Sequence, residues 1–175
     1  MLNLVKKQGL GTWITLGTML LTVIGLIIYG AALSSGMDLL VANGSQPFYD
    51  MTRPEDTAMK SMVVACGILS LVFLCAAVVV GQLKLGGLVG KILDIVVGAL
   101  RIIVPALLMV TILYFVYGSF TGLGWTFFSN EELEIVDEAI SVGHKVITGL
   151  VFLGIAALAS IVAVFFSITK KEQAE

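Results

Sequence analysis

The amino-acid sequence predicts an all-α integral membrane protein, a bundle of four transmembrane helices with both termini in the cytoplasm. Three observations support this fold class. Of the 175 residues, 58% are hydrophobic and 13% are charged, whereas soluble domains usually contain about 25% charged residues. Four stretches are apolar enough to cross a bilayer, and Lys and Arg gather in alternate connections. The whole chain, residues 1–175, is predicted to form one transmembrane domain.

The first predicted span covers residues 13–33. This run holds no charged residue and would form a helix of about 31 Å, which matches a hydrocarbon core of about 30 Å. It is longer than the apolar part of a signal peptide, so we expect a membrane anchor. An outer loop is predicted over residues 34–59. Within it, Thr52-Arg53-Pro54-Glu55 is typical of a helix start, with the proline in the first turn.

The second span is predicted over residues 61–83, and the third over residues 95–118. The third is open to two interpretations because Asp94 and Arg101 flank its first part. In one, a single tilted helix runs from Lys91 to Gly118. In the other, an interfacial helix leads into a short span with a bend at Pro105. The first is preferred, since no polar face favours a surface helix.

A second outer loop is predicted over residues 119–144, before a fourth span over residues 146–169. The first half of this loop is aromatic and suits the headgroup region. Its second half predicts a short amphipathic helix that leads into the fourth span. The acidic residues of this outer helix are Glu131, Glu132, Glu134, Asp137 and Glu138. Such a run is usually a solvated face, although it could also dock a basic partner.

The orientation follows from the basic residues in the short connections. Of the ten Lys and Arg residues, seven fall in the two tails and around the connection between the second and third spans. These are Lys6, Lys7, Lys84, Lys91, Arg101, Lys170 and Lys171. The other three, Arg53, Lys60 and Lys145, lie among a larger number of acidic residues. Basic residues favour the cytoplasmic side, so both termini are predicted to be cytoplasmic, and the plasma membrane is the expected location.

Small and hydroxyl residues at helical spacing predict where the spans touch. Inside a bilayer, close packing between helices relies on such residues. One stripe lies on the first span and another on the fourth: Gly11, Thr15, Thr18, Thr22 and Gly25, and then Gly149, Ala156, Ser160 and Ala163. Their hydroxyls are expected to bond to their own helices, which favours packing over a polar conduit.

Residue types that carry catalysis or bind cofactors are scarce. His144 is the only histidine, and we expect it to be a solvated or anchoring residue. Cys66 and Cys75 fall on opposite faces of one helix and cannot pair with each other. We therefore expect no enzyme activity, no cofactor and no metal site. The basic residues form no patch, so nucleic acid is not an expected partner.

Asp94, Arg101 and Pro105 are the candidate functional residues. Ionisable groups within a span often mark an ion or substrate path, although a group near the surface can also extend to the headgroups. The main hypothesis is a non-enzymatic accessory or scaffold subunit that contacts lipid and either other membrane subunits or copies of itself. The alternative is a small oligomeric channel or transporter that uses Asp94 and Arg101.

Overall fold

The computed structural model describes residues 8–37, 54–83, 87–128 and 136–168. These residues form four long helices: α2 (Leu10–Ala32), α3 (Pro54–Gly81), α4 (Gly87–Phe128) and α5 (Val136–Val164). A short π-helix, η1 (Leu33–Met37), continues α2. Within this part of the chain, all four helices are long and apolar enough to cross a membrane. The structure therefore supports the predicted membrane-spanning helices and membrane residence.

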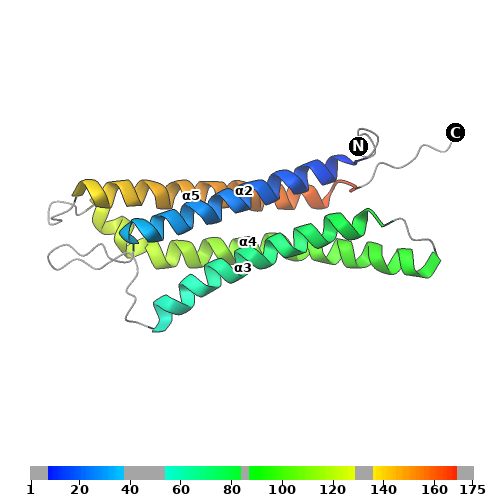
Figure 1. Ribbon diagram of the computed structural model, residues 1–175, viewed down its shortest axis with the longest axis horizontal. Coiled ribbons are helices and arrows are strands. Elements are labelled where there is room, and N and C mark those ends of the chain that lie inside the picture. The colour runs from blue at the N-terminus through cyan, green and yellow to red at the C-terminus, as the bar shows by residue number, and fades with distance from the viewer. Residues whose placement is uncertain (1–7, 38–53, 84–86, 129–135, 169–175) are drawn as a thin grey trace.

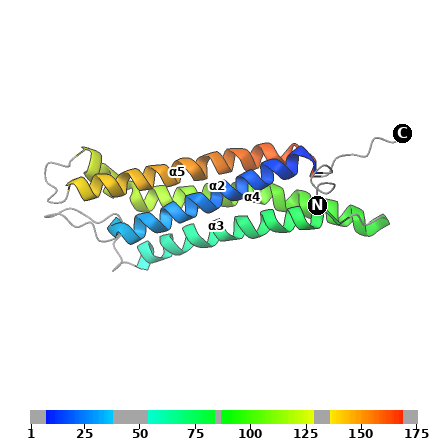
Figure 2. The same cartoon turned by 45° about the horizontal axis from the view of Figure 1, so that its top comes forward.

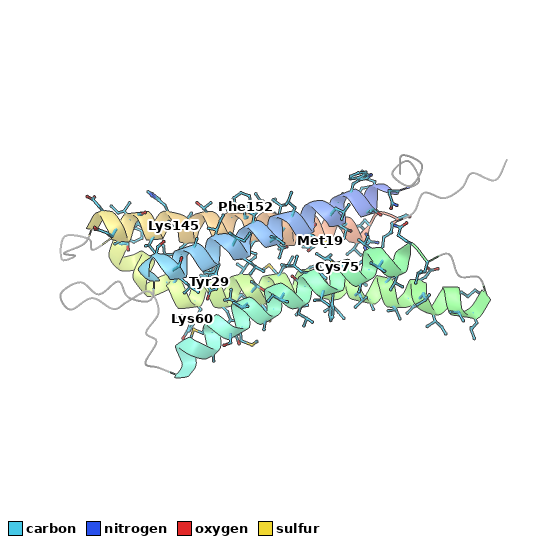
Figure 3. All side chains as sticks on the ribbon, in the orientation of Figure 1. Met19, Tyr29, Lys60, Cys75, Lys145 and Phe152 are labelled. Atoms are coloured by element: carbon cyan, nitrogen blue, oxygen red, sulfur yellow. The ribbon has the colours of Figure 1, made fainter. Side chains whose placement is uncertain are left out.

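The helices form two layers (Figure 1). One layer contains α2 and α5, which lie side by side, and the other contains α3 and α4 (Figures 1 and 2). The layers meet mainly where α4 packs along α5, whereas α2 and α3 touch over a shorter stretch. The start of α2 and the end of α5 lie at the same end of the bundle, which we call the terminal end. Lys60 and Lys145 lie at the opposite end, which we call the loop end (Figure 3).

The core lies where apolar side chains of all four helices meet. Tyr29 of α2 and Phe115 of α4 form an edge-to-face pair with ring centroids 4.7 Å apart. Val63 of α3 and Leu153 of α5 belong to the same buried cluster. Such an aromatic pair stabilises a fold by about 0.5–1.5 kcal/mol beyond the burial of its surface. This cluster fixes the arrangement of the helices near the loop end.

α3 begins at Pro54, as the proline predicted for the first turn of a helix indicated. Other helix boundaries differ from the predicted ones. α4 is a single helix that runs through Pro105 and continues to Phe128, where a loop was predicted. This extension buries Ser119 and Thr126, so it packs as a helix although its sequence is aromatic and glycine-rich. α5 ends at Val164, before the predicted boundary, because the carbonyl groups that follow bind other parts of the chain.

Candidate functional site

The end of α5 is the place where charged and polar groups of several helices converge. The last four carbonyl groups of any α-helix have no partner within the helix, and together they carry a partial negative charge. α5 ends at Val164, and the amides of Phe165 and Phe166 donate back to the carbonyl oxygens of Val162 and Ala163 over 3.1 and 3.2 Å. The carbonyl groups that follow the helix, those of residues 166–168, accept hydrogen bonds from α4 and from the start of α2.

Arg101 of α4 donates two hydrogen bonds to this part of the chain. Its side chain is only 7% exposed. The Nη2 atom donates to the carbonyl oxygen of Ala163 and, over 2.9 Å, to that of Phe166. A guanidinium at a helix C-terminus also meets the negative end of the helix dipole. Arg101 thus binds the end of α5, and its Nε atom is buried without a hydrogen-bond acceptor among the described residues.

The start of α2 supplies the remaining donors. The amide nitrogens of Gly9 and Gly11 donate to the carbonyl oxygens of Ile168 and Ser167 over 2.8 and 3.1 Å. The Thr12 hydroxyl donates to the Ile168 carbonyl over 2.7 Å. The first amides of α2 have no partner in their own helix. They donate to carbonyl groups of the segment that follows α5, which holds the start of α2 against this segment.

This contact requires glycine at both positions. A Cβ atom on Gly9 would lie 2.2 Å from the Ser167 carbonyl oxygen, and one on Gly11 would lie 2.4 Å from the Phe166 carbonyl oxygen. Backbone atoms cannot move aside as a flexible side chain can. We call the whole arrangement the terminal clasp. It consists of Gly9, Gly11, Thr12, Arg101 and residues 163–168.

The other helices pack around the terminal clasp. The Ile168 side chain is buried with Ala77 of α3 and Val97 of α4. Beside it, Gln82 and Gln8 exchange two side-chain hydrogen bonds of 2.8 and 3.2 Å. All four helices are therefore joined at the terminal end of the bundle.

Asp94 does not belong to this site. It lies on the helix face that carries Val97 and Arg101, as its spacing predicts. However, the other helices stop covering that face at Val97, so Asp94 is exposed. No ion pair between Asp94 and Arg101 is found, although both residues are described. Pro105 is half-buried within α4, and because it has no amide hydrogen it cannot bond to the carbonyl of Arg101.

The predicted packing stripes lie in the interior. All nine of their residues are buried: Gly11, Thr15, Thr18, Thr22, Gly25, Gly149, Ala156, Ser160 and Ala163. Gly25 lies against the Leu153 side chain, and Gly149 lies against Phe115. The hydroxyls of these stripes, of Ser70 in α3 and of Thr111 in α4 donate to carbonyls three or four residues earlier in the same helix. These hydrogen bonds leave apolar surfaces between the helices.

A second polar region lies at the loop end. Asp137 and Glu138 are exposed there, whereas Glu131, Glu132 and Glu134 lie outside the described residues. An open depression of about 320 Å³ has a lining of Ser35, Asp137, Glu138, Ser141, Val142 and Lys145. Lys145 donates to the Ser35 hydroxyl over 2.5 Å. His144 is exposed, and its ring lies 5.8 Å from that of Phe127.

The described ranges contain no group of three or more His, Cys, Asp or Glu side chains that could hold a metal ion. Cys66 is buried, Cys75 is exposed, and both are free thiols.

Sequence reasoning did not find the terminal clasp. The only signals of the clasp in the sequence are the glycines at positions 9 and 11 and a charge within a predicted span. Neither signal indicates that the partner is the end of α5. Comparison with known protein families, with curated proteins and with solved structures finds no match to this chain.

Proposed function

We propose that this chain is a non-enzymatic integral membrane protein that serves as an accessory or scaffold subunit of a larger membrane complex. The observation that carries the proposal is how the buried polar groups are used. Arg101 binds the end of α5, and the hydroxyls between the helices bond to their own backbones. Groups engaged in this way are not available to a substrate or an ion, so the chain acts through its surfaces.

The same observation disfavours a conduit within one copy of the chain. A path for ions needs polar groups that can exchange their partners with the ion. Thr15, Thr18 and Thr22 face α5, but their hydroxyls already donate within α2 over 2.7–2.9 Å. A transport role for Asp94 and Arg101 together would also require Arg101 to leave two carbonyl groups buried without its donors. That step is costly in a medium of low dielectric.

The outer surface offers a compact place for a partner to bind. The last part of α4 and the first part of α5 pack together, with Gly143 against the Phe127 ring. We call residues 119–128 and 136–145 the outer platform. It exposes Phe128, which is 89% exposed, together with the carboxylates of Asp137 and Glu138. An aromatic residue beside carboxylates suits a partner with an apolar contact and a basic rim.

The proposed orientation places the terminal end of the bundle in the cytoplasm and the outer platform outside, in the plasma membrane. The terminal end carries Arg101 and lies next to Lys91 along α4, whereas the platform carries Asp137 and Glu138. Basic residues near a span favour the cytoplasmic side. Both chain ends then face the cytoplasm.

Site-specific photocross-linking in native membranes tests the accessory role. A benzophenone side chain replaces Phe128 on the outer platform or, as the matched control, Leu158, which is 66% exposed on α5 within the span. We expect an adduct of one defined mass from position 128 and none from position 158. A chain that gives no protein adduct at position 128, but conducts ions when purified into liposomes, would contradict the proposal. Loss of that conductance in Asp94→Asn would then support the channel.

A further inference from the structure

The terminal clasp joins two points of the chain that are distant in the sequence. The Gly9 amide donates to the Ile168 carbonyl oxygen over 2.8 Å, and the Gly11 amide donates to that of Ser167 over 3.1 Å. The start of α2 and the end of α5 therefore lie side by side, as Figures 1 and 2 show. The segment before Gly9 and the segment after Ile168 continue the chain from one place.

Both of these segments are basic where they adjoin the clasp. Lys6 and Lys7 precede Gly9, and Lys170 and Lys171 follow Ile168. We call these four residues the tail lysines. Residues 6–12 and 165–171, the stretches within three residues of Gly9 and of Ile168, contain no Asp or Glu. The sequence around the clasp therefore carries positive charge alone.

Covalent geometry keeps the tail lysines near one another, although they lie outside the described residues. Consecutive Cα atoms are about 3.8 Å apart, so the Cα atom of Lys7 lies within about 8 Å of that of Gly9. The same limit of about 8 Å holds between Lys170 and Ile168. Because Gly9 and Ile168 are hydrogen-bonded to each other, the ammonium groups of both segments can reach one region beside the clasp.

A fifth positive charge lies within the clasp itself. The Arg101 side chain is 7% exposed, and it donates to the carbonyl oxygens of Ala163 and Phe166. Both acceptors are neutral groups, and no carboxylate among the described residues forms an ion pair with Arg101. A charge buried in a membrane protein usually has a counter-charge nearby. Within the described part of the chain, the charge of Arg101 has none.

The clasp lies at the depth of the lipid headgroups. The apolar spans of α2 and α5 begin at Leu10 and end at Val164. Gly9 directly precedes the first of these spans, and Ile168 follows the second by four residues. Trp13, one turn into α2, is 51% exposed, and tryptophan is enriched at the boundary between the bilayer core and water. The counter-charge for the clasp can therefore come from the lipids.

We propose that the terminal clasp and the tail lysines together bind the phosphate group of an anionic phospholipid. Four or more basic residues next to a membrane helix are typical of proteins that bind such lipids, which are abundant in the cytoplasmic leaflet. Free phosphate offers the same chemical group. A lipid adds acyl chains, which would contact the exposed Trp13 and Phe165 side chains. Only the choice of leaflet rests on the proposed function, through the orientation, and the accessory role does not enter.

Quenching of tryptophan fluorescence by brominated lipids tests this site in a bilayer. The chain has two tryptophans. Trp13 lies near the start of α2, and Trp125 lies near the end of α4. Trp125→Phe therefore leaves a reporter beside the clasp, whereas Trp13→Phe leaves one at the loop end as the matched control. Each chain is reconstituted into phosphatidylcholine vesicles with a rising fraction of brominated phosphatidylglycerol or brominated phosphatidylcholine. Both leaflets have the same composition, so the result does not depend on orientation.

We expect the Trp13 reporter to prefer phosphatidylglycerol over phosphatidylcholine by at least about fivefold, and the Trp125 reporter by less than about twofold. Lys7→Gln and Lys170→Gln should each lower the preference at Trp13 by about threefold to fivefold. Lys91→Gln is the control, because it removes the same charge about 15 Å along α4 from Arg101, and it should change the preference by less than about twofold. Gly9→Ala keeps all four tail lysines but separates the segments that carry them, so it should lower the preference as well.

Equal quenching by the two lipids at Trp13, an equal preference at Trp125, or an effect of Lys91→Gln as large as that of Lys7→Gln would each overturn the proposal. A preference that disappears when inorganic phosphate replaces chloride at constant ionic strength would also overturn it, because the ligand would then be free phosphate. If Gly9→Ala does not fold, the lysine variants still decide, since positions 7 and 170 lie outside the four helices. The Phe128 adduct is independent of the lipid preference, so the two proposals can fail separately.

Discussion

Arg101 is the one charged side chain that is buried among the described residues, and its place at the end of α5 gives that charge a structural purpose. In water, the carbonyl groups at a helix end accept hydrogen bonds from solvent, so the lack of a donor from the protein costs little free energy. Inside a bilayer, the same groups must find donors within the protein. A guanidinium with several fixed donors suits two neighbouring carbonyls better than a single ammonium does.

Replacement of Arg101 should therefore destabilise the fold without changing any surface contact. We expect Arg101→Leu to lower the free energy of unfolding by at least about 1.5–3 kcal/mol, the value of a hydrogen bond to a charged group. Arg101→Lys should recover part of this loss. Reversible denaturation in mixed detergent micelles measures the difference, with Asp94→Asn as the exposed control. Equal stability of Arg101→Leu and the parent chain would show that the hydrogen bonds from Arg101 to Ala163 and Phe166 contribute nothing to stability.

Gly11 should tolerate no side chain, unlike a glycine elsewhere in the same helix. A methyl group on Gly11 would meet the Phe166 carbonyl oxygen at 2.4 Å, whereas nothing lies within 4 Å of a Cβ atom on Gly17. We expect Gly11→Ala to destabilise the bundle by about 1–3 kcal/mol, because the backbones must move apart. Gly17→Ala should be neutral or stabilising by up to about 1 kcal/mol. Thermal unfolding of both variants in the same detergent decides between these outcomes, and equal melting temperatures would contradict the close approach.

At the scale of the elements, the hydroxyls of α2 divide into two kinds. Thr18 donates to Ile14 within its own helix, so its hydroxyl holds no neighbour in place. Thr12 donates across the bundle to Ile168. The first kind allows a polar residue to pack as a small apolar one, whereas the second kind joins two helix ends.

Two valine substitutions separate these roles. Thr18→Val keeps the shape of the side chain and removes only the local bond, so we expect a change within about 0.5 kcal/mol. Thr12→Val should cost about 0.5–1.5 kcal/mol, since it removes a bond between helices while the Ile168 carbonyl keeps the Gly9 amide. Denaturation curves of the two variants give the comparison directly. A larger loss at position 18 than at position 12 would reverse the assignment.

The elements that the sequence predicted well are those determined by composition and spacing. Apolar runs and a proline in a first turn indicate where α2, α3 and the start of a span lie, because these signals are local. The length of α4 was not predicted, since residues 119–128 are aromatic and glycine-rich and favour a loop by composition alone. The terminal clasp could not be predicted, because Arg101 and Thr12 bind carbonyl groups 65 and 156 residues away. Local patterns carry no information on such pairs.

At the scale of the whole molecule, the two ends of the bundle differ in what they expose. The terminal end joins all four helices and exposes the first turns of α4, residues 87–96, whereas the loop end carries the outer platform. The proposed orientation places these two surfaces on opposite sides of the membrane. A partner of one surface therefore cannot compete with a partner of the other.

This orientation predicts which side of the membrane each end can be labelled from. Gln82 and Ser141 are both exposed, at the terminal end and at the loop end. In a background without native cysteines, Ser141→Cys should react with a membrane-impermeant maleimide on intact cells. Gln82→Cys should react only after permeabilisation. Labelling of Gln82→Cys alone on intact cells would invert the topology, and labelling of both would contradict a defined orientation.

The terminal clasp also sets the order in which the protein can be completed during synthesis. α2 is made before α3, α4 and α5, yet its opening amides bind the carbonyl groups of Ser167 and Ile168, which are made after α5. Until then, the glycine-rich entry to α2 has no partner in the chain. A chain whose synthesis stops before α5 therefore lacks the carbonyl groups that accept these two amide hydrogen bonds.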